Sequence, residues 1–136
     1  MKQILYTSVE TQPIDEAGLG SLLDRARTNN AIRNVTGMLV YADGHFLQAL
    51  EGAPVDVDSI FAKIAADSRH RDVHVFLDHA IPTRTFSDWS MGFARKNIGE
   101  IAEKTGAVNL NNLSDIYRHV NDALVLDLMV GFVNLD

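Results

Sequence analysis

Residues 35–52 hold two apolar runs on either side of Asp43-Gly44. Asp-Gly between such runs is the strongest short-range signal for a two-residue β-hairpin loop of the mirror-image turn type. If these two residues form the loop, Leu39 on the first strand lies opposite Gln48 on the second. The pattern therefore predicts a central hairpin with a single register.

Side-chain alternation divides this hairpin into two faces, both largely apolar. Other parts of the chain should therefore cover both faces. Gln48 is the misfit, because a buried amide with an unmet donor or acceptor costs about 1–3 kcal/mol per group. The predicted faces are Val35, Gly37, Leu39, Tyr41, Phe46, Gln48 and Leu50 on one side, and Thr36, Met38, Val40, Ala42, His45, Leu47 and Ala49 on the other.

The segments on either side of the hairpin alternate between strand and helix patterns. The order is that of a ferredoxin-like α+β domain, β-α-β-β-α-β, with an added fifth strand. In this plan the two main helices pack on one face of the sheet. The elements that we expect around the hairpin are a strand over 2–9, a helix from Asp15 to about 28–30, a helix starting at Pro54, and strands over 73–81 and 89–94.

Residues 97–136 read as helices, a short one over 98–105 and a longer one after Asn112. The residues after Leu124 are apolar nearly all round, which indicates burial against the sheet or a partner chain. We expect this C-terminal helical cap to cover the sheet face that the two main helices leave open. The predicted division is a sheet domain over 1–96 and the cap over 97–136.

Lys and Arg number 12 against 18 Asp and Glu, a formal net charge of −6 at pH 7. This charge argues against non-specific binding to nucleic acid or to an anionic membrane surface. The sequence has no cysteine, so disulfides and thiolate sites are excluded. No signal peptide is recognisable, and the most apolar stretch, 123–133, is shorter than the roughly 20 residues of a membrane span. We therefore expect a cytoplasmic protein.

The sequence has no phosphate-binding loop, nucleophile elbow or His-Glu-x-x-His motif. Its five histidines are scattered, without the spacing that a metal site demands. A phosphatase on the same scaffold would need arginines in the loop after the first strand, and residues 9–15 contain none. We therefore expect neither an enzyme nor a metal site.

A set of polar and aromatic residues remains after these exclusions. Taken singly, its aromatic members are ordinary core residues and its asparagines end a helix. Taken together, an amide, a phenol and an indole that converge between two helices favour a pocket for a flat heteroaromatic ligand. The set consists of Tyr6, Ser8, Asn29, Asn30, Gln48, Trp89, Ser90 and Met91.

Six motifs over residues 2–95 carry a resemblance to a known family. They are Leu-Tyr-Thr-Ser (5–8), Arg-x-Asn-Asn (27–30), Thr-Gly-Met-Leu (36–39), Phe-Leu-Gln-Ala-Leu-Glu-Gly (46–52), Asp-Ser-Arg-His (67–70) and Phe-Ser-Asp-Trp-Ser-Met (86–91). In this order and spacing the sequence resembles the BLUF family, the blue-light sensors that use flavin. The resemblance implies a BLUF domain over 1–96 with FAD held noncovalently between its two helices.

The resemblance also implies roles for individual residues. Tyr6 matches the electron and proton donor to the excited flavin, and Gln48 matches the amide between that tyrosine and the flavin. Asn30 matches the amide that meets the imide edge of the ring. Trp89, Met91 and Ser8 match the photoactive surroundings. The remaining cofactor-binding matches are Leu22 and Ile64 on the two sides of the ring, and Asn29, Lys63, Asp67 and Arg69 at its polar edges or side chain.

The signal is expected to pass to an unidentified downstream protein, through the C-terminal helices or a sheet face, or through changed self-association in a homo-oligomer. One alternative stays open at this point. It is a light-independent ferredoxin-like module that binds a ligand or a partner, in which Gln48 and the Asn29-Asn30 pair would have no special role.

Overall fold

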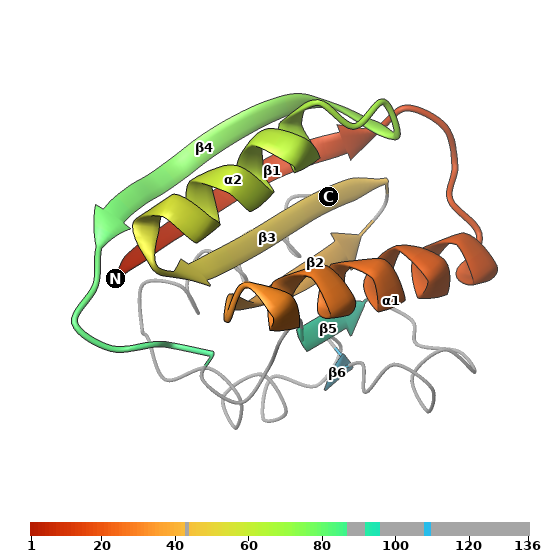
Figure 1. Cartoon of the computed structure of the whole chain (residues 1–136). Coiled ribbons are helices and arrows are strands. Elements are labelled where there is room, and N and C mark those ends of the chain that lie inside the picture. The colour runs from red at the N-terminus through yellow and green to blue at the C-terminus, as the bar shows by residue number, and fades with distance from the viewer. Residues whose placement is uncertain (43, 87–91, 96–107, 110–136) are drawn as a thin grey trace.

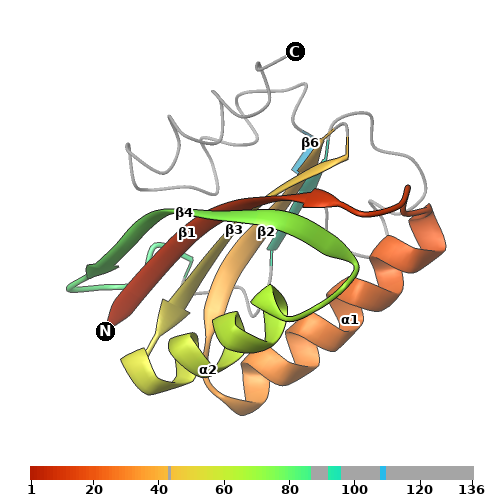
Figure 2. The same cartoon turned by 90° about the horizontal axis from the view of Figure 1, so that it is seen from above.

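The computed structural model describes residues 1–42, 44–86, 92–95 and 108–109. Within these ranges one sheet has the strand order β4-β1-β3-β2-β5-β6, and both helices lie on the same face of it (Figures 1 and 2). The ferredoxin-like prediction is confirmed by this arrangement. The elements are β1 (Lys2–Glu10), α1 (Glu16–Ile32), β2 (Thr36–Ala42), β3 (His45–Gly52), α2 (Pro54–Ala65), β4 (His70–Ala80), β5 (Gly92–Arg95) and β6 (Val108–Asn109).

The hairpin forms in the predicted register, with Leu39 opposite Gln48. Gly44 has φ 80°, a left-handed conformation that favours glycine and that the tight loop requires. On the other side of β3, Gln48 lies opposite Tyr6 of β1. Three neighbouring strands therefore place Tyr6, Gln48 and Leu39 in one row on the face that the helices cover.

The core lies between this face and the two helices. It is built by apolar side chains at alternate strand positions and at helical spacing, as the sequence predicts. The other face of the hairpin is also buried, since Met38, Val40, Leu47 and Ala49 are each at most 2% exposed. The core cluster on the helix side is Ile4, Tyr6, Leu19, Leu23, Val35, Leu39, Tyr41, Phe46, Leu50, Val57 and Ile60.

The first helix differs from the prediction at its C-terminal end. Asp15 caps its start by accepting a 2.7 Å hydrogen bond from the Gly18 amide. The helix runs on to Ile32, and Asn34 with φ 54° follows its end. The asparagine pair at 29–30 therefore lies in the last turn of the helix, which ends two residues later than predicted.

The fourth strand begins earlier than the polar segment 67–72 suggests. Because β4 is an edge strand beside β1 only, polar side chains at its start can point to solvent without breaking a core. The strand accordingly begins with His70, which is half-buried, and continues with Arg71 and Asp72, which are exposed. The predicted strand over 73–81 is thus too short at its N-terminal end.

The predicted fifth strand over 89–94 is described only from Gly92 onward, where β5 pairs in parallel with β2. Trp89, Ser90 and Met91 lie outside the described residues, as do the predicted helices of the cap. The short β6, parallel to β5, has no counterpart in the prediction. No helix in the described ranges is long and apolar enough to cross a membrane.

Replacing glycine by alanine should have opposite effects on stability at Gly20 and at Gly37. A Cβ on Gly37 would lie 1.9 Å from the backbone oxygen of Ala49, whereas a Cβ on Gly20 within α1 would meet nothing within 4 Å. Gly20→Ala should raise the free energy of unfolding by about 0.4–1 kcal/mol. Gly37→Ala should lower it, because β2 must move away from β3. Urea unfolding measures both; equal effects would contradict the tight β2–β3 contact.

Candidate functional site

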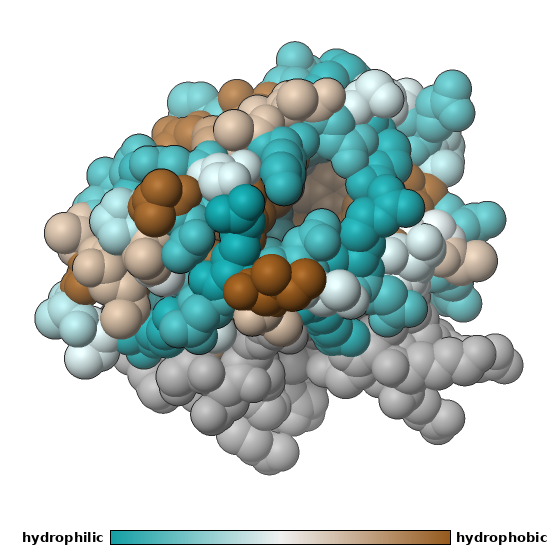
Figure 3. Space-filling view, in the orientation of Figure 1, coloured by the Kyte–Doolittle hydropathy of each residue, from teal (hydrophilic) through white to brown (hydrophobic). Residues whose placement is uncertain are grey.

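A cavity of about 410 Å³ opens between α1 and α2 above the sheet. This volume falls within the range of small-molecule sites, about 300–1,000 Å³. In the space-filling view a hollow with a more hydrophobic floor opens over the region between the two helices, within a largely hydrophilic rim (Figure 3). The residues predicted to bind a flavin that line this cavity are Tyr6, Ser8, Leu22, Asn29, Asn30, Gln48, Lys63, Ile64, Asp67 and Arg69.

The floor of the cavity holds a hydrogen bond between two buried side chains. The Tyr6 hydroxyl donates to Oε1 of Gln48, and the two residues are 2% and 5% exposed. Burial raises the pKa of the Tyr6 phenol, and the negative charge of Asp67 raises it further. The phenol therefore keeps its proton and remains a donor, which fixes the oxygen of the Gln48 amide toward Tyr6.

Ser8 follows Tyr6 on the same face of β1 and also lines the cavity. Its hydroxyl is buried, and it has no hydrogen-bond partner among the described residues. A buried hydroxyl without a partner costs about 1–3 kcal/mol. This orphaned group is a polar contact point for a ligand in the cavity.

The two helices form opposite walls. Leu22 of α1 and Ile64 of α2 are half-buried and pack against the core cluster. Asn30, near the end of α1, is 2% exposed, and its backbone oxygen accepts a 2.8 Å bond from the Val35 amide, which holds the helix end against the start of β2. The cavity thus has aliphatic walls and amide groups at its base.

Positive charge gathers at the rim. Arg33 pairs with Asp56 across the two helices at 3.3 Å, whereas the salt bridges among the described residues leave Arg25 and Lys63 without an acidic partner. Sequence reasoning missed Arg25 and Arg33. Their signal was present, because they follow Leu22 at helical spacing and so share its face.

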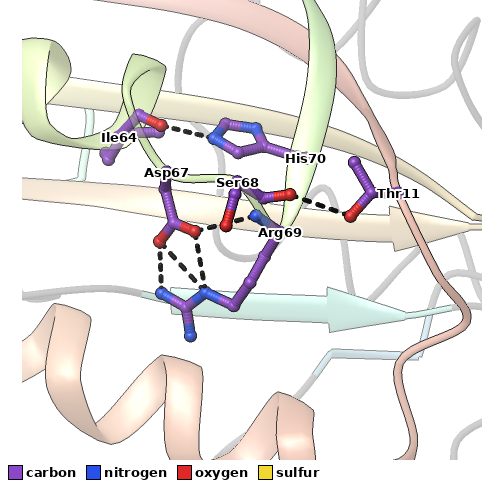
Figure 4. Close-up of polar contacts among 6 residues, drawn as sticks. All are labelled: Thr11, Ile64, Asp67, Ser68, Arg69 and His70. Atoms are coloured by element: carbon purple, nitrogen blue, oxygen red, sulfur yellow. Dashed lines mark hydrogen bonds and ion pairs between the residues drawn. The ribbon is translucent and has the colours of Figure 1, made fainter.

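The corner between α2 and β4 completes the rim (Figure 4). Arg69 pairs with Asp67 at 2.5 Å, and the hydrogen bonds from Arg69 lower the pKa of this carboxyl group to about 2. In Figure 4 the His70 ring points away from this pair toward the Ile64 backbone oxygen, 2.5 Å from its Nε2. His70 lines the cavity too, a position that sequence reasoning did not assign to it.

The model of one protein family matches residues 1–92, and its description is sensors of blue light using FAD. The match covers more than half of the chain. The chain belongs to the BLUF family. The resemblance read from the sequence motifs is thereby confirmed, and the light-independent alternative is not favoured.

Curated relatives agree with this assignment. The photoactivated adenylate cyclase subunit beta of Euglena gracilis is 36% identical over 95 residues, which are 67% of this chain and 11% of the relative. The subunit alpha of the same organism is 31% identical over 93 residues. The chain therefore spans only about a tenth of the length of these relatives. The family match concerns a sensory module, and the cyclase activity is that of the relatives.

Solved structures agree on the fold. BlrB, a BLUF protein in its dark state, is 25% identical with a TM-score of 0.72, and the match covers 97% of this chain and 94% of that one. BlsA in its ground state is 27% identical with a TM-score of 0.69, covering 88% of this chain and 86% of that one. These matches fit a BLUF blue-light sensor whose cofactor is FAD.

The residues of the cavity fit this cofactor. A flavin has a flat apolar ring, an imide edge with donors and acceptors, and negatively charged phosphates. The cavity offers aliphatic walls for the ring, the orphaned Ser8 hydroxyl and the amides of Asn30 and Gln48 for polar atoms, and cations for phosphate. The roles of single residues, and those of Trp89 and Met91 outside the described ranges, stay predictions.

The Asp67–Arg69 pair predicts how stability depends on pH. The folded-state pKa of Asp67, about 2, lies below the ordinary 3.8, so the unfolded chain takes up the proton first as pH falls. The stabilisation by this carboxyl group is complete above pH 3.8 and is lost as pH falls toward about 2.

Asp67→Asn should therefore lower the thermal midpoint above pH 3.8, and the difference from the wild type should shrink toward pH 2. Circular dichroism melting across this pH range measures it. Asp72→Asn, the same change of charge at an exposed ion pair with Arg71, is the control and should leave the acid dependence as it is. A constant difference between Asp67→Asn and the wild type would contradict the assignment.

Proposed function

We propose that this BLUF domain detects blue light through FAD held noncovalently in the cavity between α1 and α2, and that the Tyr6–Gln48 pair converts absorption into a structural signal. The observation that carries the proposal is the hydrogen bond from the Tyr6 hydroxyl to Gln48 on the cavity floor. It joins a redox-active phenol to a group that can change its hydrogen bonding without changing its charge.

Residues of the two helices and the corner after α2 hold the cofactor. Leu22 and Ile64 pack on the two sides of the ring, and Asn30 meets its imide edge. Lys63 and Arg25, which no acidic side chain neutralises among the described residues, attract the phosphates. Asn29, Asp67 and Arg69 lie at the polar rim of the cavity.

When bound, the flavin supplies blue-light absorption and an excited state that accepts an electron. Tyr6 would give an electron to the flavin and then pass its hydroxyl proton to Gln48, the acceptor of its hydrogen bond, and both would later return. While Tyr6 lacks its proton, it cannot donate a hydrogen bond to the Gln48 oxygen. The Gln48 amide would then rotate or convert to its imidic-acid tautomer.

The rearranged Gln48 would offer a hydrogen to a carbonyl of the flavin ring, and this new hydrogen bond would shift the absorption to the red. The amide is suited to this role because one end donates and the other accepts. Walls of Leu22 and Ile64 restrict water, so the new arrangement persists until thermal relaxation restores the Tyr6–Gln48 bond.

The signal leaves through the sheet. Gln48 lies beside Leu39 of β2, and β5 pairs with β2 on its other edge. We infer that β5 passes the change from domain 1–96 to the helical cap 97–136, and from there to a downstream protein or to a second copy of the chain. A cytoplasmic location suits such a partner.

Removing the tyrosine hydroxyl tests the mechanism. The purified protein should be yellow, and blue light should shift its absorption reversibly to the red. Tyr6→Phe and Gln48→Glu should each abolish the full red shift, because the first removes the proton donor and the second the amide. Tyr41→Phe is the matched control, since its hydroxyl donates to Glu10. A wild-type red shift in either test variant would disprove the mechanism.

Replacing Trp89 should affect the photocycle in a different way from replacing Tyr6 or Gln48. The family resemblance implies that the Trp89 indole competes with Tyr6 as an electron donor, so Trp89→Phe should change the yield or the lifetime of the red-shifted state and leave the state itself accessible. Flash photolysis with detection at the red edge of the flavin band measures both quantities. An unchanged photocycle would show that Trp89 is only part of the wall.

A further inference from the structure

A row of polar side chains crosses the sheet face opposite the cavity. His79 of β4 lies opposite Gln3 of β1, Gln3 opposite Glu51 of β3, and Glu51 opposite Thr36 of β2. Hydrogen bonds join each neighbour to the next. Because the Gln3 oxygen can only accept, its amide nitrogen is turned toward Glu51. Four strands are therefore linked through one row, and Glu51 is its most buried member.

Glu51 is fully buried, with 0% of its surface exposed. Its Oε1 accepts from the Thr36 hydroxyl at 3.1 Å and the Phe86 amide at 2.5 Å. Its Oε2 accepts from the Gln3 amide at 3.3 Å and the Thr85 backbone amide at 2.9 Å. A carboxyl group is tolerated in such a place only when its oxygens are bonded. Two of the four donors belong to the chain that follows β4.

The Arg84 side chain makes further hydrogen bonds that hold residues 84–86 against the sheet. Its Nη1 donates to the Thr36 hydroxyl at 2.8 Å and to the Glu51 backbone oxygen at 3.0 Å. Its Nη2 donates to the Asn34 backbone oxygen at 2.7 Å. Residues 84–86 are thus fixed to the ends of β2 and β3, and Phe86 is 2% exposed.

This attachment sets one end of a short connection. Residues 87–91, which include Trp89 and Met91, separate Phe86 from Gly92, where β5 pairs with Met38 of β2. Glu51 holds the N-terminal end of that connection and β2 holds the other. Glu51 also follows Gln48 by three positions on β3, with its side chain on the opposite face. A movement of β3 at Gln48 therefore reaches the connection through Glu51.

We propose that Glu51 is a positioning residue that couples the Gln48 rearrangement to the segment 84–95. The inference rests on the proposed photochemistry and adds the route by which it leaves the cavity. Glu51 takes no part in forming the red-shifted state, since it lies on the other face of the sheet. It transmits that state, because its carboxyl group ties the segment to the strand that carries Gln48.

Glu51→Gln is the sharpest variant. Glutamine has nearly the same shape but replaces one acceptor oxygen by an NH₂ group, which would face two donors. At least one of the donors that now bond the Glu51 carboxyl group must then move away from the side chain. Asp58→Asn is the matched control, because it makes the same chemical change at an exposed carboxyl group outside the row. Arg84→Met is a second test variant, which loosens the segment and leaves Glu51 its four donors.

The experiment uses the full chain loaded with FAD and compares absorption with hydrogen exchange in darkness and under blue light. Glu51→Gln and Arg84→Met should keep the red shift and lose about half or more of the light-minus-dark exchange difference over 84–95. Asp58→Asn should keep both. A purely structural role would lower the thermal midpoint and leave the light-minus-dark difference unchanged.

Each outcome decides between the two proposals. The coupling role would be overturned if both test variants kept the full light-minus-dark exchange difference of the wild type. It would also be overturned if the wild-type protein showed the red shift without any exchange difference over 84–95. A wild type without a red shift would instead overturn the photochemistry. If Glu51→Gln does not fold, Arg84→Met carries the test alone.

Discussion

The hydrogen bond between Tyr6 and Gln48 is the interaction on which the rest of the site depends. It lies on a sheet floor between two helices, with both partners nearly inaccessible to water. Burial keeps the phenol protonated, because it raises the pKa of Tyr6. The orientation of the Gln48 amide therefore depends on the Tyr6 hydroxyl, and a change at this donor changes what the amide presents to the cavity.

The strand β3 carries polar groups on both of its faces, and it thereby connects the binding pocket to the segment before β5. Gln48 faces the cavity, whereas Glu51 faces away and holds residues 84–86. Apolar side chains fill most other positions of the strand. An event in the cavity and the placement of the segment before β5 thus depend on one piece of backbone.

The hairpin and the cavity floor could be predicted from the sequence because they follow from local rules. Asp43-Gly44 fixes the register of Leu39 and Gln48, and strand alternation brings Tyr6 to the same face. The partners of Glu51 after β4 could not be predicted, because these two of its four donors lie 34 and 35 positions away in a loop without periodicity. The early start of β4 was missed for a related reason, since an edge strand tolerates polar residues that a central strand does not.

The rim shows the same limit. Helical spacing from Leu22 would have indicated Arg25, but only the packed helices show that Arg25 and Lys63 line the same cavity. Likewise, His70 was one of five scattered histidines in the sequence and becomes part of the cavity only through the corner after α2. Residues whose roles depend on distant segments need the fold before they can be assigned.

Infrared difference spectroscopy of the flavin-loaded protein with labelled glutamine side chains tests the central claim most directly. The chain has three glutamines, at positions 3, 12 and 48, so a Gln12→Asn background leaves two labelled amides. Illumination should shift a labelled amide carbonyl band, and the shift should vanish in Tyr6→Phe. A red-shifted flavin without any change in a labelled amide band would contradict the account.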